Sequence, residues 1–305
     1  MNVFTDDEIG EHLLNVINKE FRDADLVELL GTFVSHKQEE GFSFGRMVHL
    51  HYALFGGQDR SVALRSVAAV EAFILALDIL DDLEDQDGSE KRWTKEPIAL
   101  SMNGSTALIM LATSMLQRVD SSGQAVARLS QSGMRAVTGQ HHDLLESIHS
   151  EETYFRMIEH KSGSLMALAC MVGTLLGKGE DDELVKAYAI EFGCAAQLAN
   201  DIDDALRLDP TNDILHRKRT LPTLKLMEHE GEEADWLRHY YSGVITEDAF
   251  LERKKEVFEW ASRSSAITYS MVKKRVYQLR AIEKVQDVDG QEEIKGQLIK
   301  VMQSI

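Results

Sequence analysis

Residues 72–87 read AFILALDILDDLEDQD, and this stretch decides how the chain folds. Apolar residues surround four aspartates at helical spacing, Asp78, Asp81, Asp82 and Asp85, which share one face because residues three and four apart are neighbours on a helix. Carboxylates ordered on an apolar helix repel one another and lose hydration, so a cation is expected beside them. Mg²⁺ takes carboxylate oxygens and shares them with substrate phosphates. The stretch therefore predicts a metal–diphosphate site; the alternative is a partly exposed acidic end of a core helix.

The composition favours an all-α chain with an acidic surface. Of 305 residues, 44% are hydrophobic and 28% are charged, as in a globular protein. Only three prolines occur, the first at Pro97, and proline breaks helix interiors. The net charge of −18 argues against nucleic acid and anionic membranes as partners. A diphosphate is also repelled unless a metal and a few cations invert the local field.

The termini and cysteines give the expected location. The sequence begins MNVFTDDEIG, which has neither the basic nor the apolar region of a signal peptide. We expect no apolar run long enough to span a bilayer. Cys170 and Cys194 show neither a disulfide framework nor a zinc spacing. A reducing, cytoplasmic location is therefore expected.

The chain shows no linker, repeat or strand-like alternation, so residues 1–305 are predicted to form a single helical bundle of roughly ten or more helices. Gly88 is expected to end the helix that carries the first acidic stretch. Asp209-Pro210 is expected to end a later helix. The motif-bearing core covers about residues 40–225, and residues 224–305 form further, more charged helices.

A second acidic stretch lies about 120 residues after the first, in QLANDIDDAL. Gln197, Asn200, Asp201 and Asp204 share a helical face. Bundle cores build metal sites from side chains on facing helices, so the two acidic helices are predicted to hold Mg²⁺ between them.

A diphosphate also needs direct contacts from cations. The candidates are Lys91, Arg92, Lys161 and Lys218. Gln140, in the segment GQHHD, is either a core amide or a site ligand, and spacing does not decide between them.

These motifs together resemble the trans-isoprenyl diphosphate synthase family, which is an all-α bundle with two aspartate-rich motifs on facing helices. The matching positions lie within residues 40–225 and are Asp81, Asp82 and Asp85; Gly139, Gln140 and Asp143; Lys161-Ser162; Asn200, Asp201 and Asp204; and Lys218 before Thr220, Leu221 and Pro222. The resemblance implies that the aspartates and Asn200 bind Mg²⁺. It also implies that the lysines, Gln140 and Gln197 bind a diphosphate.

One departure from the family pattern concerns the second substrate, isopentenyl diphosphate. Where the family carries basic residues after a glycine pair, this chain has Gln58, Asp59 and Ser61. The family's histidine for the same substrate corresponds to Ile74. The site for the allylic diphosphate is therefore expected to be kept and the isopentenyl site to be lost.

The same pattern resembles a peptide-modifying branch of the family, which implies a specific reaction. A geranyl or farnesyl group would pass from its diphosphate to a tryptophan of a small competence pheromone precursor peptide, and the enzyme would be a homodimer. Ala76 and Leu77 lie where bulk limits prenyl length in the family, and the small Ala76 mildly favours farnesyl. The alternatives are a chain-elongating synthase, a catalytically silent regulatory subunit of such a synthase, and a terpene cyclase.

Overall fold

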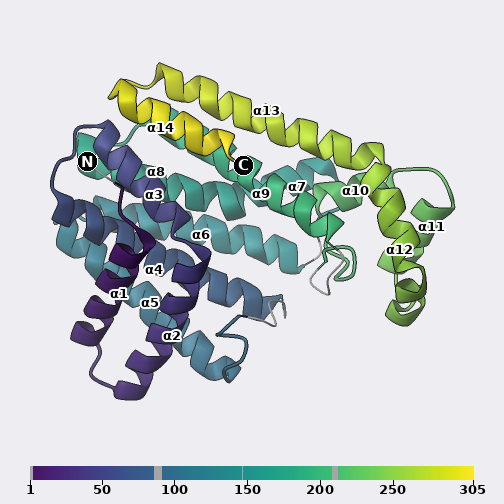
Figure 1. Ribbon diagram of the computed structural model, residues 1–305, viewed down its shortest axis with the longest axis horizontal. Coiled ribbons are helices and arrows are strands. Elements are labelled where there is room, and N and C mark those ends of the chain that lie inside the picture. Colours follow the sequence, from purple (N-terminus) through teal and green to yellow (C-terminus); the bar gives the residue numbers. More distant parts are fainter. Residues whose placement is uncertain (1–2, 86–90, 146, 208–211) are drawn as a thin grey trace.

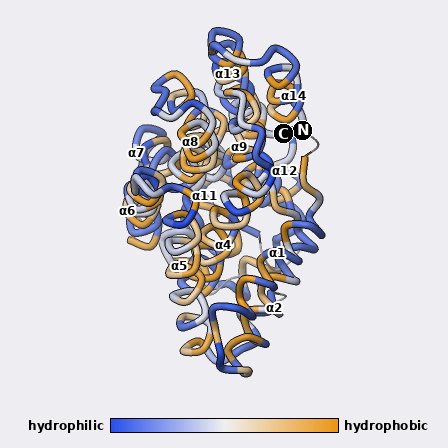
Figure 2. The backbone as a smooth tube through the Cα atoms, turned by 90° about the vertical axis from the view of Figure 1, so that its left-hand side faces the viewer, coloured by the Kyte–Doolittle hydropathy of each residue, from blue (hydrophilic) through white to orange (hydrophobic). Residues whose placement is uncertain are grey.

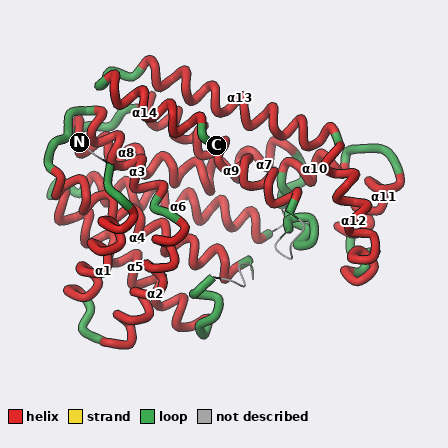
Figure 3. Tube along the Cα trace, in the orientation of Figure 1, coloured by secondary structure: helices red, strands yellow, loops and turns green. Residues whose placement is uncertain are grey.

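The computed structural model of the chain is a bundle of α-helices (Figure 1) and describes residues 3–85, 91–145, 147–207 and 212–305. No strand occurs in these ranges, and the all-α prediction is confirmed (Figure 3). The elements in chain order are α1 (Asp6–Glu20), α2 (Ala24–Glu40), α3 (Ser43–Leu54), α4 (Arg60–Glu84), α5 (Ile98–Val119), α6 (Gln124–Leu144), α7 (Glu151–Ile158), the π-helical turn η1 (Glu159–Gly163), α8 (Ser164–Lys178), α9 (Glu183–Leu206), α10 (Leu221–Met227), α11 (Glu232–Tyr241), α12 (Glu247–Arg263), α13 (Ser265–Asp287) and α14 (Glu292–Gln303).

The ends of the helices follow local sequence signals. Thr5 and Glu8 form a capping box at the start of α1, in which each side chain accepts a hydrogen bond from the other residue's backbone N–H. Gly179 ends α8 in the left-handed conformation, at φ +87°, which glycine adopts without strain. The predicted terminators Gly88 and Asp209-Pro210 lie outside the described residues; α4 ends at Glu84 and α9 at Leu206.

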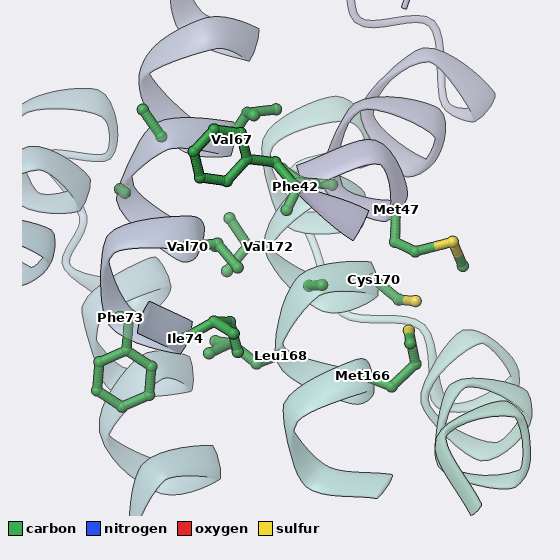
Figure 4. Close-up of a cluster of buried hydrophobic side chains, with 14 of the residues drawn as sticks. Phe42, Met47, Val67, Val70, Phe73, Ile74, Met166, Leu168, Cys170 and Val172 are labelled. Atoms are coloured by element: carbon green, nitrogen blue, oxygen red, sulfur yellow. The ribbon is translucent and has the colours of Figure 1, made fainter. Parts of the chain in front are cut away.

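The core forms where α4 packs against α8, α3 and α5. Figure 4 shows Val67, Val70 and Ile74 of α4 facing Leu168 and Val172 of α8. Fully burying one such side chain contributes about 1.5–3 kcal/mol. The outer helices are amphipathic, as the alternation of orange and blue residues along α1 and α2 shows (Figure 2). The core therefore fixes α4 at the centre of the bundle, with its acidic end projecting toward the site.

Helices α3 and α8 approach each other at a glycine. A Cβ atom at Gly173 would lie 2.2 Å from the carbonyl oxygen of Val48. Any larger residue there must push the two backbones apart. Glycine at this position is thus a packing requirement of the bundle.

The expectation that no apolar segment is long enough to span a bilayer was wrong, because one helix meets the length and composition of a membrane span. The helix α5 has 22 residues and a mean hydropathy of 1.3 over its most apolar window, of which 39% is buried in the bundle. It packs along α4. Core helices of water-soluble proteins pass the same test, so one such helix is weak evidence for a membrane span.

Helices α11 and α12 form a lobe at one end of the bundle, on the right in Figure 1. A second hydrophobic cluster, which includes Leu237, Phe250 and Phe258, packs the lobe against Leu226 of α10 and Ala266 of α13. The lobe also supports the loop that precedes α10. The Tyr240 hydroxyl donates to the Leu215 carbonyl at 2.7 Å, and the Tyr241 hydroxyl donates to the Lys218 carbonyl at 3.0 Å.

Candidate active site

A cavity of about 530 Å³ lies between the acidic ends of α4 and α9. Its wall is completed by α2, α6, η1 and the loop before α10. The predicted site residues that line it are Leu77, Asp81, Asp85, Gln140, Lys161, Gln197, Asn200, Asp201, Asp204 and Lys218. Folding therefore brings both acidic motifs and two of the predicted cations to one cavity.

The first acidic motif is paired with lysines from distant segments. Lys161 Nζ lies 2.8 Å from Asp81 Oδ1, and Lys218 Nζ lies 3.1 Å from Asp85 Oδ2. Gln140 Nε2 donates to Asp85 Oδ1 at 3.1 Å. These contacts offset the repulsion between the aspartates. The same lysines are positioned for a diphosphate.

The π-helical turn η1 delivers Lys161 to the cavity. A Cβ atom at Gly139 would lie 2.5 Å from the backbone nitrogen of Lys161, so only glycine lets α6 approach this turn closely. Burial lowers the pKa of Lys161, but the carboxylates of Asp81 and Asp143 outweigh it and hold that pKa above its usual range. Lys161 is therefore charged at neutral pH. Sequence periodicity gave no sign of the π-helical turn.

The second acidic motif is buried among neutral donors. Asp201 is 4% exposed, and its carboxylate accepts from Gln197 Nε2 at 2.7 Å and from the Tyr154 hydroxyl. Burial raises the pKa of Asp201 to about 6, although both hydrogen bonds act in the opposite direction. Asp204 forms an ion pair with Arg207 at 3.0 Å.

The structure shows where Asp82 lies relative to the cavity, and its metal-binding role stays a prediction. Its Oδ2 accepts a hydrogen bond from Trp93 Nε1 at 2.7 Å, and Asp82 is not among the cavity-lining residues. Burial raises the pKa of Asp82 to about 6. Asp81 and Asp82 are successive on a helix and point about 100° apart. Only Asp81 therefore faces the cavity, and Asp82 instead ties α4 to Trp93.

Three further predicted substrate contacts lie away from the cavity. Lys91 pairs with Glu40, and Arg92 is exposed; neither lines the cavity. Ala76 is fully buried, and its carbonyl accepts from Ser105 Oγ at 2.7 Å. Their predicted substrate contacts stay predictions: in this structure Lys91, Arg92 and Ala76 lie outside the cavity wall, whereas Leu77 lines it.

Two features of the cavity were missed from sequence. Lys37 of α2 pairs with Asp78 of α4, Nζ to Oδ2 at 2.7 Å, and both residues line the cavity. Asp213 also lines it and is 5% exposed; burial, and then the charge of Asp201, raises its pKa well above the usual value. Only its position five residues before Lys218 could have indicated Asp213. Nothing local in the sequence connects Lys37 to the site.

The donors present suit a hard divalent cation. Among the described residues, no three His, Cys, Asp or Glu side chains are already gathered as a metal cluster. Mg²⁺ does not require such a cluster, because it is commonly held by one or two carboxylates, water and substrate phosphates. Asp81, Asp85, Asp201 and Asp204 supply such oxygens around the cavity. Gln140 Oε1 is buried there and has no hydrogen-bond partner in the part of the chain that the structure describes. The residues therefore fit Mg²⁺ together with a diphosphate.

The fold and the two facing acidic motifs define a helical enzyme that handles diphosphates. Residues 44–259 match the model of the polyprenyl synthetase family, and the chain belongs to this family. It is a prenyltransferase.

Two relatives and one solved structure place the chain further. It is 31% identical over 220 residues to the tryptophan prenyltransferase ComQ of Bacillus spizizenii, and the match covers 72% of this chain and 78% of that protein. It is 29% identical over 292 residues to ComQ of Bacillus subtilis, covering 93% and 94%. A crystal structure of a geranylgeranyl pyrophosphate synthase aligns with a TM-score of 0.83 at 20% identity, over 99% of this chain and 98% of that one, and shows the same fold.

Proposed function

We propose that this enzyme transfers a geranyl or farnesyl group from its diphosphate to a tryptophan of a small competence pheromone precursor peptide, with Mg²⁺ as cofactor. The similarity to ComQ over nearly the whole chain supports this acceptor. The observation that carries the proposal is the cavity itself. Its lysines Lys161 and Lys218, which pair with the first acidic motif, are positioned to bind one diphosphate.

The positions that would hold a second diphosphate are used for other purposes. Asp59 caps α4, and its Oδ1 accepts from the backbone N–H groups of Ser61 at 2.8 Å and Val62 at 3.2 Å. Arg60 pairs with Glu8, and Ile74 is fully buried. In the described part of the chain, none of residues 58–61 lines the cavity. An uncharged acceptor such as an indole does not need these positions to be basic.

The donor end of the cavity binds the allylic diphosphate through Lys161 and Lys218. When the diphosphate enters, each ammonium exchanges its aspartate partner for a phosphate oxygen, which forms a comparably strong charge-assisted hydrogen bond. Asp81, Asp85, Asp201 and Asp204 would hold Mg²⁺, which when bound would supply charge stabilisation for the departing diphosphate. Leaving of the diphosphate breaks the allylic carbon–oxygen bond.

The rest of the cavity protects and directs the prenyl group. Phe44, Leu77 and Leu165 provide apolar lining that excludes water from an allylic cation. The indole carbon donates its electron pair to the allylic carbon, and the new carbon–carbon bond forms. In the proposed reaction, a backbone nitrogen of the peptide then closes a ring onto the indole and loses its proton.

A paired assay tests the proposal. One reaction contains enzyme, Mg²⁺, farnesyl or geranyl diphosphate, and a tryptophan-bearing precursor peptide; the other contains isopentenyl diphosphate instead of the peptide. We expect a mass gain on the peptide in the first and no elongated diphosphate in the second. The size of the gain identifies the prenyl group. A Trp→Ala peptide is the control for the acceptor, and elongation without peptide modification would contradict the proposal.

We also propose a cytoplasmic homodimer. Large apolar side chains are exposed on α5 and α6, for example Ile98 (63%), Met110 (62%) and Met134 (65%). Exposed apolar surface of this kind is common at subunit interfaces. Light scattering coupled to gel filtration should give twice the chain's 34.3 kDa, and a monomeric mass would contradict the dimer. The free thiols of Cys170 and Cys194 are both buried and agree with a reducing compartment.

A further inference from the structure

The Lys37–Asp78 pair is the feature of the cavity that the proposed reaction does not use. Lys37 comes from α2 and Asp78 from α4, three residues before Asp81. Their side chains meet at 2.7 Å in the cavity wall. The pair therefore joins two helices and contributes polar groups to the wall.

Lys37 is a strongly held cation. Its side chain is 12% exposed, compared with 37% for Asp78. Burial lowers the pKa of Lys37, but the carboxylates of Asp78, Glu71 and Glu40 outweigh burial and hold that pKa above its usual range. Of these, Glu40 lies 3.6 Å away, and burial raises the pKa of Glu71 to about 8. Asp78 is thus the carboxylate in direct contact with the ammonium.

Lys161 and Lys218 differ from Lys37 in the role of the carboxylates with which they pair. Lys161 and Lys218 pair with Asp81 and Asp85, the carboxylates that fit a metal. A cation bound there would compete with the lysines for Asp81 and Asp85, so the lysines would then contact a phosphate; Lys161 would keep Asp143, at 3.3 Å, as a partner. Asp78 lies outside that motif, so Lys37 keeps its partner when the donor binds. Its charge then remains neutralised in the loaded enzyme.

We propose that the Lys37–Asp78 pair determines acceptor specificity. Asp78 neutralises the ammonium of Lys37, which would otherwise bind a second diphosphate, and the cavity wall at these two residues is thereby reserved for an uncharged acceptor. This inference rests on the proposed function and names the residues that enforce its substrate class. Asp78 acts through Lys37 and does not itself contact the acceptor. Removing the Asp78 charge should therefore create a binding site for a diphosphate.

The test measures binding of isopentenyl diphosphate and does not need the peptide. The enzyme is loaded with Mg²⁺ and an unreactive thio analogue of farnesyl diphosphate, and isopentenyl diphosphate is added in a calorimeter. We expect Asp78→Asn to bind it at least about tenfold more tightly than the wild type, since one charge-assisted hydrogen bond is gained. Asp78→Glu should behave like the wild type because it keeps the counter-charge.

The double variant Lys37→Met with Asp78→Asn is the decisive control. It should lose the gained affinity, because the freed ammonium is then absent. Unchanged affinity for the farnesyl analogue and an unchanged melting temperature show that each variant is folded. No gain in Asp78→Asn, or a gain that survives in the double variant, would overturn the inference. If wild-type enzyme fails to modify the peptide while Asp78→Asn still gains affinity, the proposed acceptor is wrong and the role of the pair stands.

Discussion

The acidic ends of α4 and α9 face the same cavity, but their buried carboxylates are stabilised by different partners. On α4, Asp81 and Asp85 each contact a lysine from another segment. On α9, the hydrogen-bond partners of Asp201 within the described residues are the neutral donors Gln197 and Tyr154. Burial raises the pKa of both Asp81 and Asp201; at Asp81 the charge of Lys161 acts in the opposite direction, whereas at Asp201 the hydrogen bonds from Tyr154 and Gln197 do so. Asp204, the other carboxylate of the second motif, is paired with Arg207.

The difference indicates separate contributions to metal binding. A cation at α4 must replace two existing ion pairs, so the net gain there is small. A cation at α9 relieves a carboxylate that is otherwise poorly stabilised as an anion. We infer that Asp201, whose partners in the described residues are neutral, gains more from a bound cation than Asp81, which Lys161 already contacts. The lysines that would contact the diphosphate come from η1 and from the loop before α10, and they pair with the acidic end of α4.

The largest expected effect separates the two neighbours on α4. Asp81→Asn should lower kcat by on the order of 10²–10³-fold, because it removes a carboxylate proposed to hold the metal and leaves Lys161 with Asp143 alone as its carboxylate partner at the site. Asp82→Asn should cost less, since the Asp82 carboxylate contacts Trp93 outside the cavity. Steady-state kinetics on both variants tests this. Equal losses would place Asp82 in the metal site, as the sequence predicted.

A second variant should separate activity from stability on α9. Asp201→Asn should reduce turnover strongly, yet raise the free energy of unfolding by about 1 kcal/mol at pH 7, because a desolvated charge is removed. Asp203→Asn on the exposed face of the same helix is the matched control and should change neither quantity. Denaturant titration and kinetics measure the two effects. A destabilised Asp201→Asn protein would show that the buried carboxylate is better compensated than its contacts indicate.

The pH dependence follows from the same raised pKa. Asp201 releases its proton at about pH 6 in the folded protein and near its ordinary 3.8 when unfolded. Between these values the folded state binds more protons, so the Asp201 contribution to stability falls as pH rises through this window. Affinity for Mg²⁺ should increase over the same range, since the anion binds the metal. Calorimetric titration at pH 5 and pH 7 checks this; equal affinities would contradict the comparison.

The smallest expected effect concerns Tyr154. Tyr154→Phe removes a donor to Asp201, which should raise the pKa of Asp201 further and lower turnover less than tenfold at pH 7. The acid limb of the pH–rate profile should move to higher pH. If the substitution acted only through lost packing, the rate would fall and the acid limb would stay at the same pH.

Local pattern predicted the two motifs because helical spacing is set by the backbone. It placed Asp81, Asp85, Asp201 and Asp204 on cavity-facing sides, and the structure brings them together. It could not separate Asp81 from Asp82, because the rotation of α4 about its axis is fixed by packing against α8. A contact such as Lys37 with Asp78 joins residues 41 apart and has no local signature.

The shape of the loop before α10 depends on the lobe. Arg217 adopts φ +55°, which is unfavourable for a residue with a side chain. Its guanidinium lies 4.4 Å from the centre of the Tyr240 ring, a contact that helps to hold this conformation. Neither the strain nor its support can be read from the segment alone.

The separate hydrophobic cluster of α11 and α12 has a consequence for the timing of the reaction cycle. The cluster also contains Ile214 of the loop before α10, so a movement of the lobe involves the segment that carries Lys218, and native-state hydrogen exchange measures how readily such a unit opens. Because the Tyr241 hydroxyl donates to the Lys218 carbonyl, opening of the lobe would also loosen the residue whose ammonium is proposed to bind the diphosphate. We therefore expect the opening rate of the lobe to set an upper limit on how fast inorganic diphosphate leaves the enzyme.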